Sequence, residues 1–392
     1  MRRTLIENSR VWQEDGFVSG RTLVLRDGVI EGLLPAADLE RQPGDRRIDG
    51  SGAYALPGFV DLHIHGSMGF DVMDGLLQSL RNLCDFLMRT GVTSFLATTM
   101  TGSAARIKAA LSAMSTLQPG TPFQGVHIEG PYLNPAYRGS QPAAHLREPK
   151  PEEYLPWLKT GLVKMITLAP EIAGGEDLMH EALTHGATVS IGHSGADYEA
   201  ASRYFAAGAR QVTHTFNGMP GIHHRQPGIF VAALENPHVT FQIIPDGIHV
   251  HPAVVRMLLR LVGVERVVVI TDAMVATGLG DGDYALGDVA VTVQDGQART
   301  PSGGLAGSTL TMSQALRNMM SFCDLSLAEV IPMLTRVPAR SIGEYPRKGS
   351  LEAGADADIV LWDEQQSVQA TFIKGELVYQ AAGECTAAIA DG

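Results

Sequence analysis

The middle of the chain alternates between continuous apolar runs and stretches whose apolar residues recur at helical spacing. Leu76, Leu80, Leu83 and Leu87 lie three to four residues apart, and Gly91 then precedes the apolar run VTSFLATT. This spacing predicts a helix that ends at a glycine before the next strand. Eight apolar runs span residues 58–66, 92–99, 123–130, 163–170, 187–194, 211–217, 239–246 and 265–273.

The apolar runs lack the polar–apolar alternation of a half-exposed strand, which is typical of parallel strands buried on both faces. Eight β-α units, at roughly 250 residues or more, match a (β/α)8 barrel of the TIM type in number and length. An open, doubly wound sheet is the alternative. We favour the barrel because an open sheet rarely gathers this many parallel strands.

Both ends of the chain differ from the middle, because they carry short β-type segments separated by Asp-Gly and Gly steps. GRTLVLRDGVIEGLLP near the start and SVQATFIKGELVYQ near the end are examples, and Lys374-Gly375 suits the turn of a hairpin. We therefore predict an α/β protein with a small β-sandwich domain built from both termini, residues 1–55 and 345–392, and a barrel at 56–344.

The composition narrows the class of protein. Of 392 residues, 45% are hydrophobic and 18% are charged, which argues against long disorder. No apolar run reaches the roughly 18 residues of a membrane helix, so we expect no membrane partner. Cys84, Cys323 and Cys385 are few and widely spaced, which indicates a reducing cytoplasm instead of a disulfide framework.

The charge of the chain is acidic. Lys+Arg 30 against Asp+Glu 42 gives a net charge of −12. Such a chain repels a polyanion on average, and no basic cluster offsets the repulsion, so nucleic acid is not an expected partner. A small anionic substrate needs only a few cations that are placed locally.

Metal-binding and acid–base residue types gather at the carboxyl ends of the apolar runs. In a barrel these ends open to one mouth, so residues far apart in sequence converge there. Positions i and i+2 of a strand point to the same side, so the first two residues of the set could hold one ion together. The set is His63, His65, Glu129, His193, His214 and Asp272.

Each residue of this set also has a structural interpretation. A single histidine at a strand end is more often hydrogen-bonded than a ligand, Glu129 could accept backbone bonds beside Gly130, and Asp272 could cap the next segment. Burying six polar residues without a bound partner would cost several kcal/mol, so the joint pattern predicts a metal site. Imidazole and carboxylate ligands without cysteine favour Zn²⁺, with Fe²⁺, Mn²⁺ and Co²⁺ as alternatives.

Several longer motifs carry a resemblance to a known family. The most specific are LPGFVDLHIHG, GVHIEGPYLNP, THTFNGMPGIHHRQPG and VITDAM. Over nearly its whole length the chain resembles the amidohydrolase superfamily, and within it the N-acetylglucosamine-6-phosphate deacetylases. The resemblance implies hydrolysis of N-acetylglucosamine 6-phosphate to glucosamine 6-phosphate and acetate, in amino-sugar catabolism and cell-wall recycling. N-Acetylgalactosamine 6-phosphate is the alternative substrate.

The same resemblance implies roles for the strand-end residues. The main metal ligands are Glu129, His193 and His214. His63 and His65 match a second metal site that only some members keep, and no lysine is placed to bridge two ions, so Glu129 would have to bridge them. The resemblance leaves one or two metals open. Asp272 matches the residue that takes a proton from water and returns it to the leaving amine.

Further residues match the family's substrate contacts. Asn217 and the backbone at Gly218 resemble a phosphate-binding segment. Arg225 resembles a phosphate-binding arginine supplied by a neighbouring subunit, and His249 resembles a second substrate contact. The resemblance therefore implies a homodimer in which Arg225 completes the site of the neighbour, with His249 as a second candidate for this role.

One position departs from the family pattern. The family often has a histidine that polarises the substrate carbonyl, where this chain has Gln141 in Arg138-Gly139-Ser140-Gln141. The amide of Gln141 can still donate a hydrogen bond in a weaker role of this kind. His145, four residues on, is the alternative.

Two other functions compete with the deacetylase interpretation. A different amidohydrolase, such as a dihydroorotase-like ring opener or an N-acyl-amino-acid deacylase, is disfavoured by the Arg225 segment and by the missing bridging lysine. A non-enzymatic metal-binding barrel is disfavoured by Asp272, because a pure metal binder needs no base beside the ion.

Overall fold

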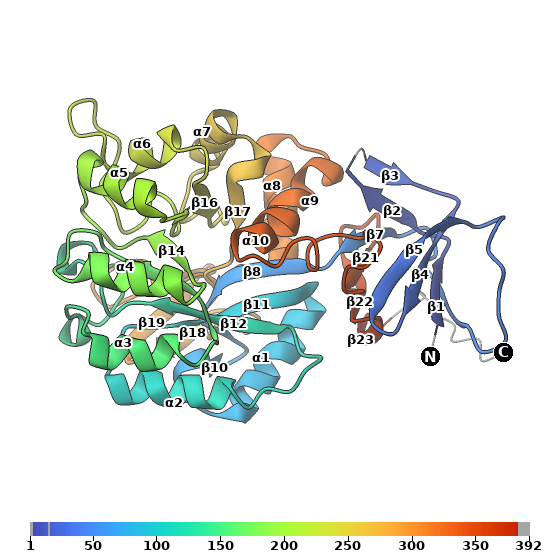
Figure 1. Cartoon of the computed structure of the whole chain (residues 1–392), viewed down its shortest axis with the longest axis horizontal. Helices are drawn as coiled ribbons and strands as arrows, with labels where there is room; N and C mark the ends of the chain where they lie inside the picture. Colours follow the sequence, from blue (N-terminus) through green and yellow to red (C-terminus); the bar gives the residue numbers. More distant parts are fainter. Residues whose placement is uncertain (1–2, 15, 383–392) are drawn as a thin grey trace.

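The computed structural model describes residues 3–14 and 16–382, and Figure 1 shows its two parts. One part surrounds a central sheet with helices, and the other consists of strands from both ends of the chain. Cys385 and the rest of 383–392, which we assigned to the terminal domain, lie outside the described residues. No helix within the described part is long and apolar enough to cross a bilayer.

Eight parallel strands form the central sheet, and their order in the sheet follows their order in the chain. The ring closes where Asp272 N donates to His63 O at 2.8 Å and Ile64 bridges Ala273. The predicted barrel is confirmed, and the open sheet is wrong. The strands are β8 (Phe59–Ile64), β11 (Val92–Thr99), β12 (Phe123–Glu129), β13 (Val163–Leu168), β14 (Thr188–Ile191), β15 (Gln211–Val212), β16 (Thr240–Ile243) and β17 (Val267–Val269).

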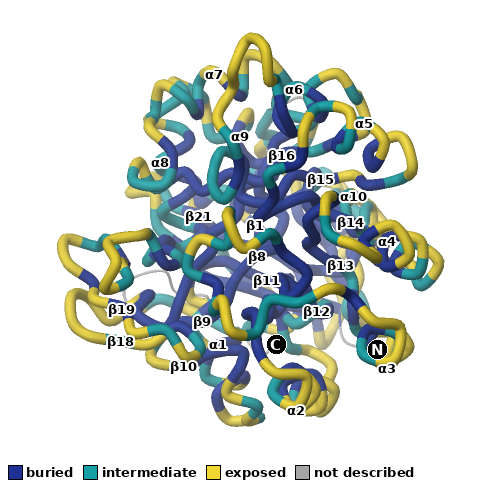
Figure 2. Tube along the Cα trace, turned by 90° about the vertical axis from the view of Figure 1, so that its left-hand side faces the viewer, coloured by how far each residue is buried: buried dark blue, intermediate teal, exposed yellow. Residues whose placement is uncertain are grey.

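An α-helix follows each of these strands and covers the outside of the barrel (Figure 1). The first helix buries Leu80, Leu83 and Leu87 as predicted, but Leu76 lies just before the helix and is 60% exposed. In Figure 2 the strands are buried and the helices carry the exposed outer faces. The helices are α1 (Leu77–Arg89), α2 (Ala104–Met114), α3 (Pro151–Leu158), α4 (Gly175–Thr184), α5 (Tyr198–Ala207), α6 (Gly228–Glu235), α7 (Pro252–Val262) and α8 (Met312–Cys323).

Smaller elements interrupt or extend the βα units. A three-stranded antiparallel sheet lies between β17 and α8, and two further helices follow α8. The sheet contains β18 (Gly282–Leu286), β19 (Val289–Gln294) and β20 (Gln297–Arg299), and the helices are α9 (Leu327–Leu334) and α10 (Arg336–Ser341). The remaining short elements are β9 (Gly66–Ser67), β10 (Phe70–Asp71), η1 (Val72–Asp74), η2 (Pro135–Tyr137), η3 (Ala143–His145) and η4 (Val264–Arg266).

The terminal strands form two sheets. The four-stranded sheet has the order β5-β4-β1-β6, and the six-stranded sheet has the order β23-β22-β21-β7-β2-β3, in which antiparallel pairing of β21 with β7 joins the two ends of the chain. The strands are β1 (Arg3–Glu7), β2 (Arg10–Gln13), β3 (Gly16–Val18), β4 (Arg21–Arg26), β5 (Val29–Pro35), β6 (Arg46–Asp49), β7 (Tyr54–Pro57), β21 (Ile359–Trp362), β22 (Val368–Ile373) and β23 (Glu376–Gln380).

The central strands of the six-stranded sheet are buried on both faces. On β21, Ile359 and Leu361 pack in a core shared with the four-stranded sheet, whereas Val360 and Trp362 pack in the barrel core. This division follows the two-residue period of a strand. The predicted hairpin is present, because Lys374 and Gly375 connect β22 to β23 with φ values of 48° and 74°. We propose 1–55 and 345–392 as one domain, which the shared core supports.

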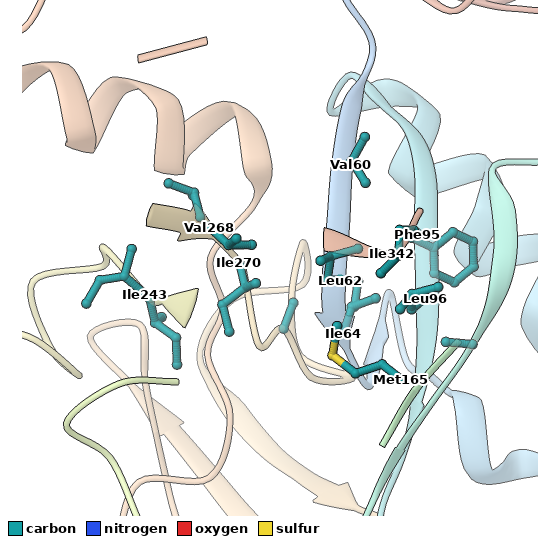
Figure 3. Packing of buried hydrophobic residues seen from close by; sticks show 14 of the residues in the cluster. Val60, Leu62, Ile64, Phe95, Leu96, Met165, Ile243, Val268, Ile270 and Ile342 are labelled. Carbon is teal, nitrogen blue, oxygen red and sulfur yellow. The ribbon is translucent and has the colours of Figure 1, made fainter. Parts of the chain in front are cut away.

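The alternation along β8 separates packing from chemistry. Val60, Leu62 and Ile64 pack among apolar side chains, and Figure 3 shows them beside residues of β11. Asp61 and His63 occupy the other face of the same strand, and both are fully buried. The apolar face therefore fixes the strand while the polar face points towards the site.

Candidate metal centre and active site

The six polar residues predicted at the strand ends meet at one mouth of the barrel. Each lies between the penultimate residue of a barrel strand and three positions beyond its end, and all are buried. His63 and His65 belong to the end of β8, Glu129 to β12, His193 to β14, His214 to β15 and Asp272 to β17.

Glu129 lies between two pairs of histidines. Its Oε1 atom is 3.2 Å from His193 Nε2 and 3.1 Å from His214 Nε2. Its Oε2 atom is 3.3 Å from His65 Nε2, and Oε1 is 3.4 Å from His63 Nε2. In each of the two triads that share Glu129, the three ligand atoms lie within 4.8 Å of one another. Glu129 is therefore the residue that the two candidate ligand sets have in common.

In each of the four histidines, the second ring nitrogen, Nδ1, lies within hydrogen-bond distance of an oxygen atom. A carbonyl oxygen can only accept, so Nδ1 carries the hydrogen and the lone pair of the neutral ring lies on Nε2, towards the site. The pairs are His193 Nδ1 with Tyr137 O (2.9 Å), His214 Nδ1 with Asn217 O (3.2 Å), His65 Nδ1 with Thr98 O (3.1 Å) and His63 Nδ1 with Gln242 Oε1 (3.2 Å).

This arrangement of lone pairs fits a metal ion. The Nε2 atoms of His193 and His214 lie 3.0 Å apart, and Glu129 Oε1 is close to both. Three electron-pair donors at this distance repel one another unless a metal ion or a proton lies among them. Imidazole nitrogens with a carboxylate oxygen are the ligand set of zinc and other first-row divalent metals.

The carboxyl groups of the site are ionised beside the histidines. Burial opposes the charge on Glu129, but the neighbouring histidines outweigh it and hold the pKa of this carboxyl well below its usual range. Burial also opposes the charge on Asp272, and His63 and His65 nevertheless lower its pKa to about 2. Asp272 Oδ1 lies 3.4 Å from His63 Nε2 and 3.2 Å from His65 Nε2. Both carboxyl groups are therefore deprotonated at neutral pH.

Three site residues have left-handed backbone conformations. The φ angles are 48° at His193, 26° at His214 and 50° at Asp272. Residues other than glycine rarely adopt these values, which cost about 1–3 kcal/mol each and cluster at functional sites. The turns after β14, β15 and β17 are thus strained at the residues that point into the site.

A cavity of about 260 Å³ opens beside this cluster. Four of the predicted substrate residues line it, together with Leu286 and Leu305 from the segment between β17 and α8. A Cβ atom on Gly218 would lie 2.9 Å from His193 Nδ1, so this position requires glycine. The four substrate residues are Gln141, Asn217, Gly218 and His249.

The amide of Gln141 is bonded at both ends. Its Nε2 atom donates to Glu129 Oε2 at 2.7 Å, and its Oε1 atom accepts from Thr101 N at 2.8 Å. Gln141 is therefore held against a metal-ligand candidate as well as lining the cavity. The alternative residue, His145, is not among the residues that line the cavity.

His249 lines the cavity of its own chain. Its Nδ1 atom lies 2.6 Å from Asp246 Oδ2. Burial opposes a proton on His249, but the Asp246 carboxylate outweighs it and raises the pKa of the ring. A donor that faces the cavity from this position suits an oxygen-rich or anionic ligand. Its reach into a partner's site stays a prediction.

Arg225 lies outside the cavity of its own chain. It sits on an exposed loop between β15 and α6, where its Nη1 atom is 2.7 Å from His224 Nε2. Ile222 on the same loop is 51% exposed. The structure therefore separates Arg225 from the other predicted substrate residues of the same chain.

Two residues that support the site were missed in the sequence. Gln242 in β16 accepts from His63 Nδ1 and donates to Gln211 Oε1 at 2.7 Å. Asp61 accepts from His63 N at 3.2 Å and from Thr271 Oγ1 at 2.6 Å. Each is a polar residue inside an otherwise apolar strand, and this pattern is visible in the sequence.

Comparison with known proteins places this site in a family. The model of the amidohydrolase family matches residues 54–378, most of the chain. The chain belongs to the amidohydrolase family. The resemblance inferred from the sequence is confirmed.

The relatives of this amidohydrolase are named for two different substrates. It is 38% identical to an N-acetylglucosamine-6-phosphate deacetylase from Vibrio furnissii over 385 residues, which cover 96% of this chain and 94% of the relative. It is 34% identical to an N-acetylgalactosamine-6-phosphate deacetylase from Shewanella sp. strain ANA-3 over 387 residues, which cover 96% of each protein.

A solved structure extends the comparison. The amidohydrolase is similar, with a TM-score of 0.89 and 31% identity, to a variant of N-acetyl-D-glucosamine-6-phosphate deacetylase from Mycobacterium smegmatis in complex with N-acetyl-D-glucosamine-6-phosphate. The match covers 97% of this chain and 100% of that chain. The likeness therefore includes the terminal sheets as well as the barrel.

Proposed function

We propose that this amidohydrolase hydrolyses the acetamide of N-acetylglucosamine 6-phosphate and releases acetate and glucosamine 6-phosphate, a step of amino-sugar catabolism and cell-wall recycling. The observation that carries the proposal is the set of two histidine pairs around Glu129 with the Asp272 carboxylate beside them. The relatives of this name that match nearly the whole chain support the substrate.

Glu129, His193 and His214 would hold the main divalent metal, and His63 and His65 would share Glu129 to hold a second one. A divalent metal in such a site acts as a Lewis acid and lowers the pKa of bound water towards about 7. The ligand set favours Zn²⁺, with Fe²⁺, Mn²⁺ and Co²⁺ as alternatives. The hydrogen bonds on the Nδ1 atoms hold the four rings in place for this purpose.

Asp272 acts as the base and then as the acid. Asp272 is deprotonated at neutral pH, so its carboxylate can accept the proton of the attacking water. The same proton then passes from Asp272 to the amide nitrogen, because an amine leaves only when it is protonated. Gln141, whose amide lines the cavity, remains a candidate for polarising the substrate carbonyl.

Asn217, the backbone at Gly218 and His249 would bind the sugar phosphate from within the chain. Arg225 would reach the phosphate from the neighbouring subunit of a homodimer, which its exposed position outside its own cavity supports. The planar guanidinium can donate two hydrogen bonds to a phosphate. We assign the protein to the cytoplasm on its sparse, widely spaced cysteines, of which Cys84 and Cys323 are free.

N-Acetylgalactosamine 6-phosphate is the second candidate substrate, because relatives named for it match the chain about as well. Acetate release from four compounds tests both proposals: the two acetylated sugar 6-phosphates and the two unphosphorylated sugars. We expect turnover of N-acetylglucosamine 6-phosphate to exceed that of its epimer, and both to exceed that of the unphosphorylated sugars. Preference for the galactose epimer would select the second candidate, and equal turnover without phosphate would contradict both.

A further inference from the structure

A second cavity, separate from the barrel mouth, lies in the terminal sheets. It measures about 390 Å³, and we call it the arginine cavity because Arg10, Arg21, Arg41 and Arg47 line it. Glu7 is the single acidic residue among its lining residues, so the lining carries a net charge of +3 in a chain whose overall charge is −12. A positive cavity on an acidic protein is a local feature that the catalytic site does not explain.

Three of the four arginines keep donors that no ion pair within the described residues uses. Glu7 is buried and holds Arg41 at Oε1 (2.9 Å) and Arg47 at Oε2 (2.8 Å). Each of these guanidinium groups uses Nε and Nη2 towards Glu7, and no bond to described residues involves its Nη1 atom. Glu7 therefore orients two arginines without occupying all their donors.

The other two arginines differ in their partners. Arg10 is fully engaged by Gly52 O, Tyr54 and Glu364, with an exposed salt bridge to Glu364 at 2.8 Å. Arg21 has a single long bond of 3.4 Å to Leu33 O and no acidic partner among the described residues. Arg21, Arg41 and Arg47 thus keep free donors around one cavity.

Ser9 also lines the arginine cavity, but its hydroxyl oxygen is buried and lies out of reach of a ligand in the cavity. The arginines therefore supply the charged donors of the site.

We propose that the arginine cavity binds a small phosphate monoester, at a site distinct from the catalytic one. Guanidinium groups match the oxygens of a phosphate, and a volume of about 390 Å³ lies in the range of small-molecule sites. Glu7 orients Arg41 and Arg47 before the ligand binds. The proposal does not depend on the proposed deacetylase activity.

Calorimetric titration of the full chain with glycerol 3-phosphate tests the proposal, with glycerol as the uncharged control ligand. We expect saturable binding of the phosphate compound and none of glycerol. Arg21→Ala combined with Arg41→Ala should weaken the binding about 100-fold or more.

Two matched variants separate this site from other causes. Arg26→Ala changes an arginine at the other end of β4 that does not line the cavity, and Arg225→Ala changes the arginine assigned to the catalytic phosphate. Both should bind glycerol 3-phosphate in this site with wild-type affinity. The proposal is wrong if the wild-type protein shows no saturable binding. It is also wrong if the binding survives the double variant, or is lost in Arg225→Ala instead.

Discussion

Three of the four site histidines depend on oxygen atoms that the sequence does not reveal. Their residue type and their place at the ends of apolar runs could be predicted, because both are visible in single segments. The acceptors of His65, His193 and His214 are backbone carbonyls, which any residue supplies, so no sequence pattern marks them. The acceptor of His63 is the side chain of Gln242, which the sequence shows as a polar residue in a strand.

Replacement of Gln141 tests whether it acts on Glu129 or on the substrate. Gln141→Ala removes the donor at 2.7 Å from Glu129 Oε2, and we expect metal affinity to fall roughly 10- to 100-fold, the usual effect of losing a group that orients a ligand. Competition with a chromogenic chelator measures this affinity. Gln118→Ala, at an exposed glutamine, is the control. Unchanged metal affinity with reduced kcat would assign Gln141 to the substrate carbonyl instead.

The two histidine pairs should differ in their effect on metal content. His193→Ala removes a ligand of the main ion, so we expect loss of both metal and acetate release. His63→Ala removes a ligand of the second ion, so about one ion per chain should remain. Elemental analysis of both variants measures the difference. Equal loss of metal in the two variants would argue against two unequal sites.

At the scale of elements, the barrel strands were predictable and the inserted sheet was not. All eight apolar runs contain a barrel strand, because parallel strands buried on both faces leave a continuous apolar signal. β19 alternates exposed and buried positions, so it lacks such a run. Leu286, at the end of β18, nevertheless reaches the catalytic cavity.

The contact between β8 and β11 predicts the effect of a single methyl group. A Cβ atom on Gly58, just before β8, would lie 2.0 Å from Thr93 Oγ1 in β11. Gly58→Ala should therefore displace one strand and destabilise the protein by about 1–3 kcal/mol, as overpacking usually does. Gly32→Ala, at a strand glycine with no atom within 4 Å of a built Cβ, is the matched control. Thermal unfolding compares the two, and an equal Tm would contradict this packing.

At the scale of the whole molecule, the joining of the two chain ends could be predicted from their similar composition. The closure of the barrel followed from the count of units, whereas the assembly of subunits leaves no such trace within one chain. Arg225 lies on an exposed loop and away from the cavity of its own chain. Its assignment as a phosphate ligand therefore requires a neighbouring subunit.

A mixing experiment tests the proposed dimer. Asp272→Asn chains lack the base, and Arg225→Ala chains lack the phosphate contact. In a mixed dimer, the site on the Arg225→Ala chain has an intact Asp272 and receives Arg225 from its partner. Activity should therefore rise above that of either variant alone. If subunit exchange is verified and no activity returns, Arg225 does not act across the interface.

Asp272 is the residue on which the proposed reaction depends most directly. Asp272→Asn preserves the shape of the side chain and removes the base, and acetate release from N-acetylglucosamine 6-phosphate is measured at matched metal content. We predict a kcat lower by roughly 10²–10⁴-fold, the usual scale of general acid–base catalysis, with metal retained. A metal-loaded variant whose kcat stays within a few-fold of wild type would contradict the account.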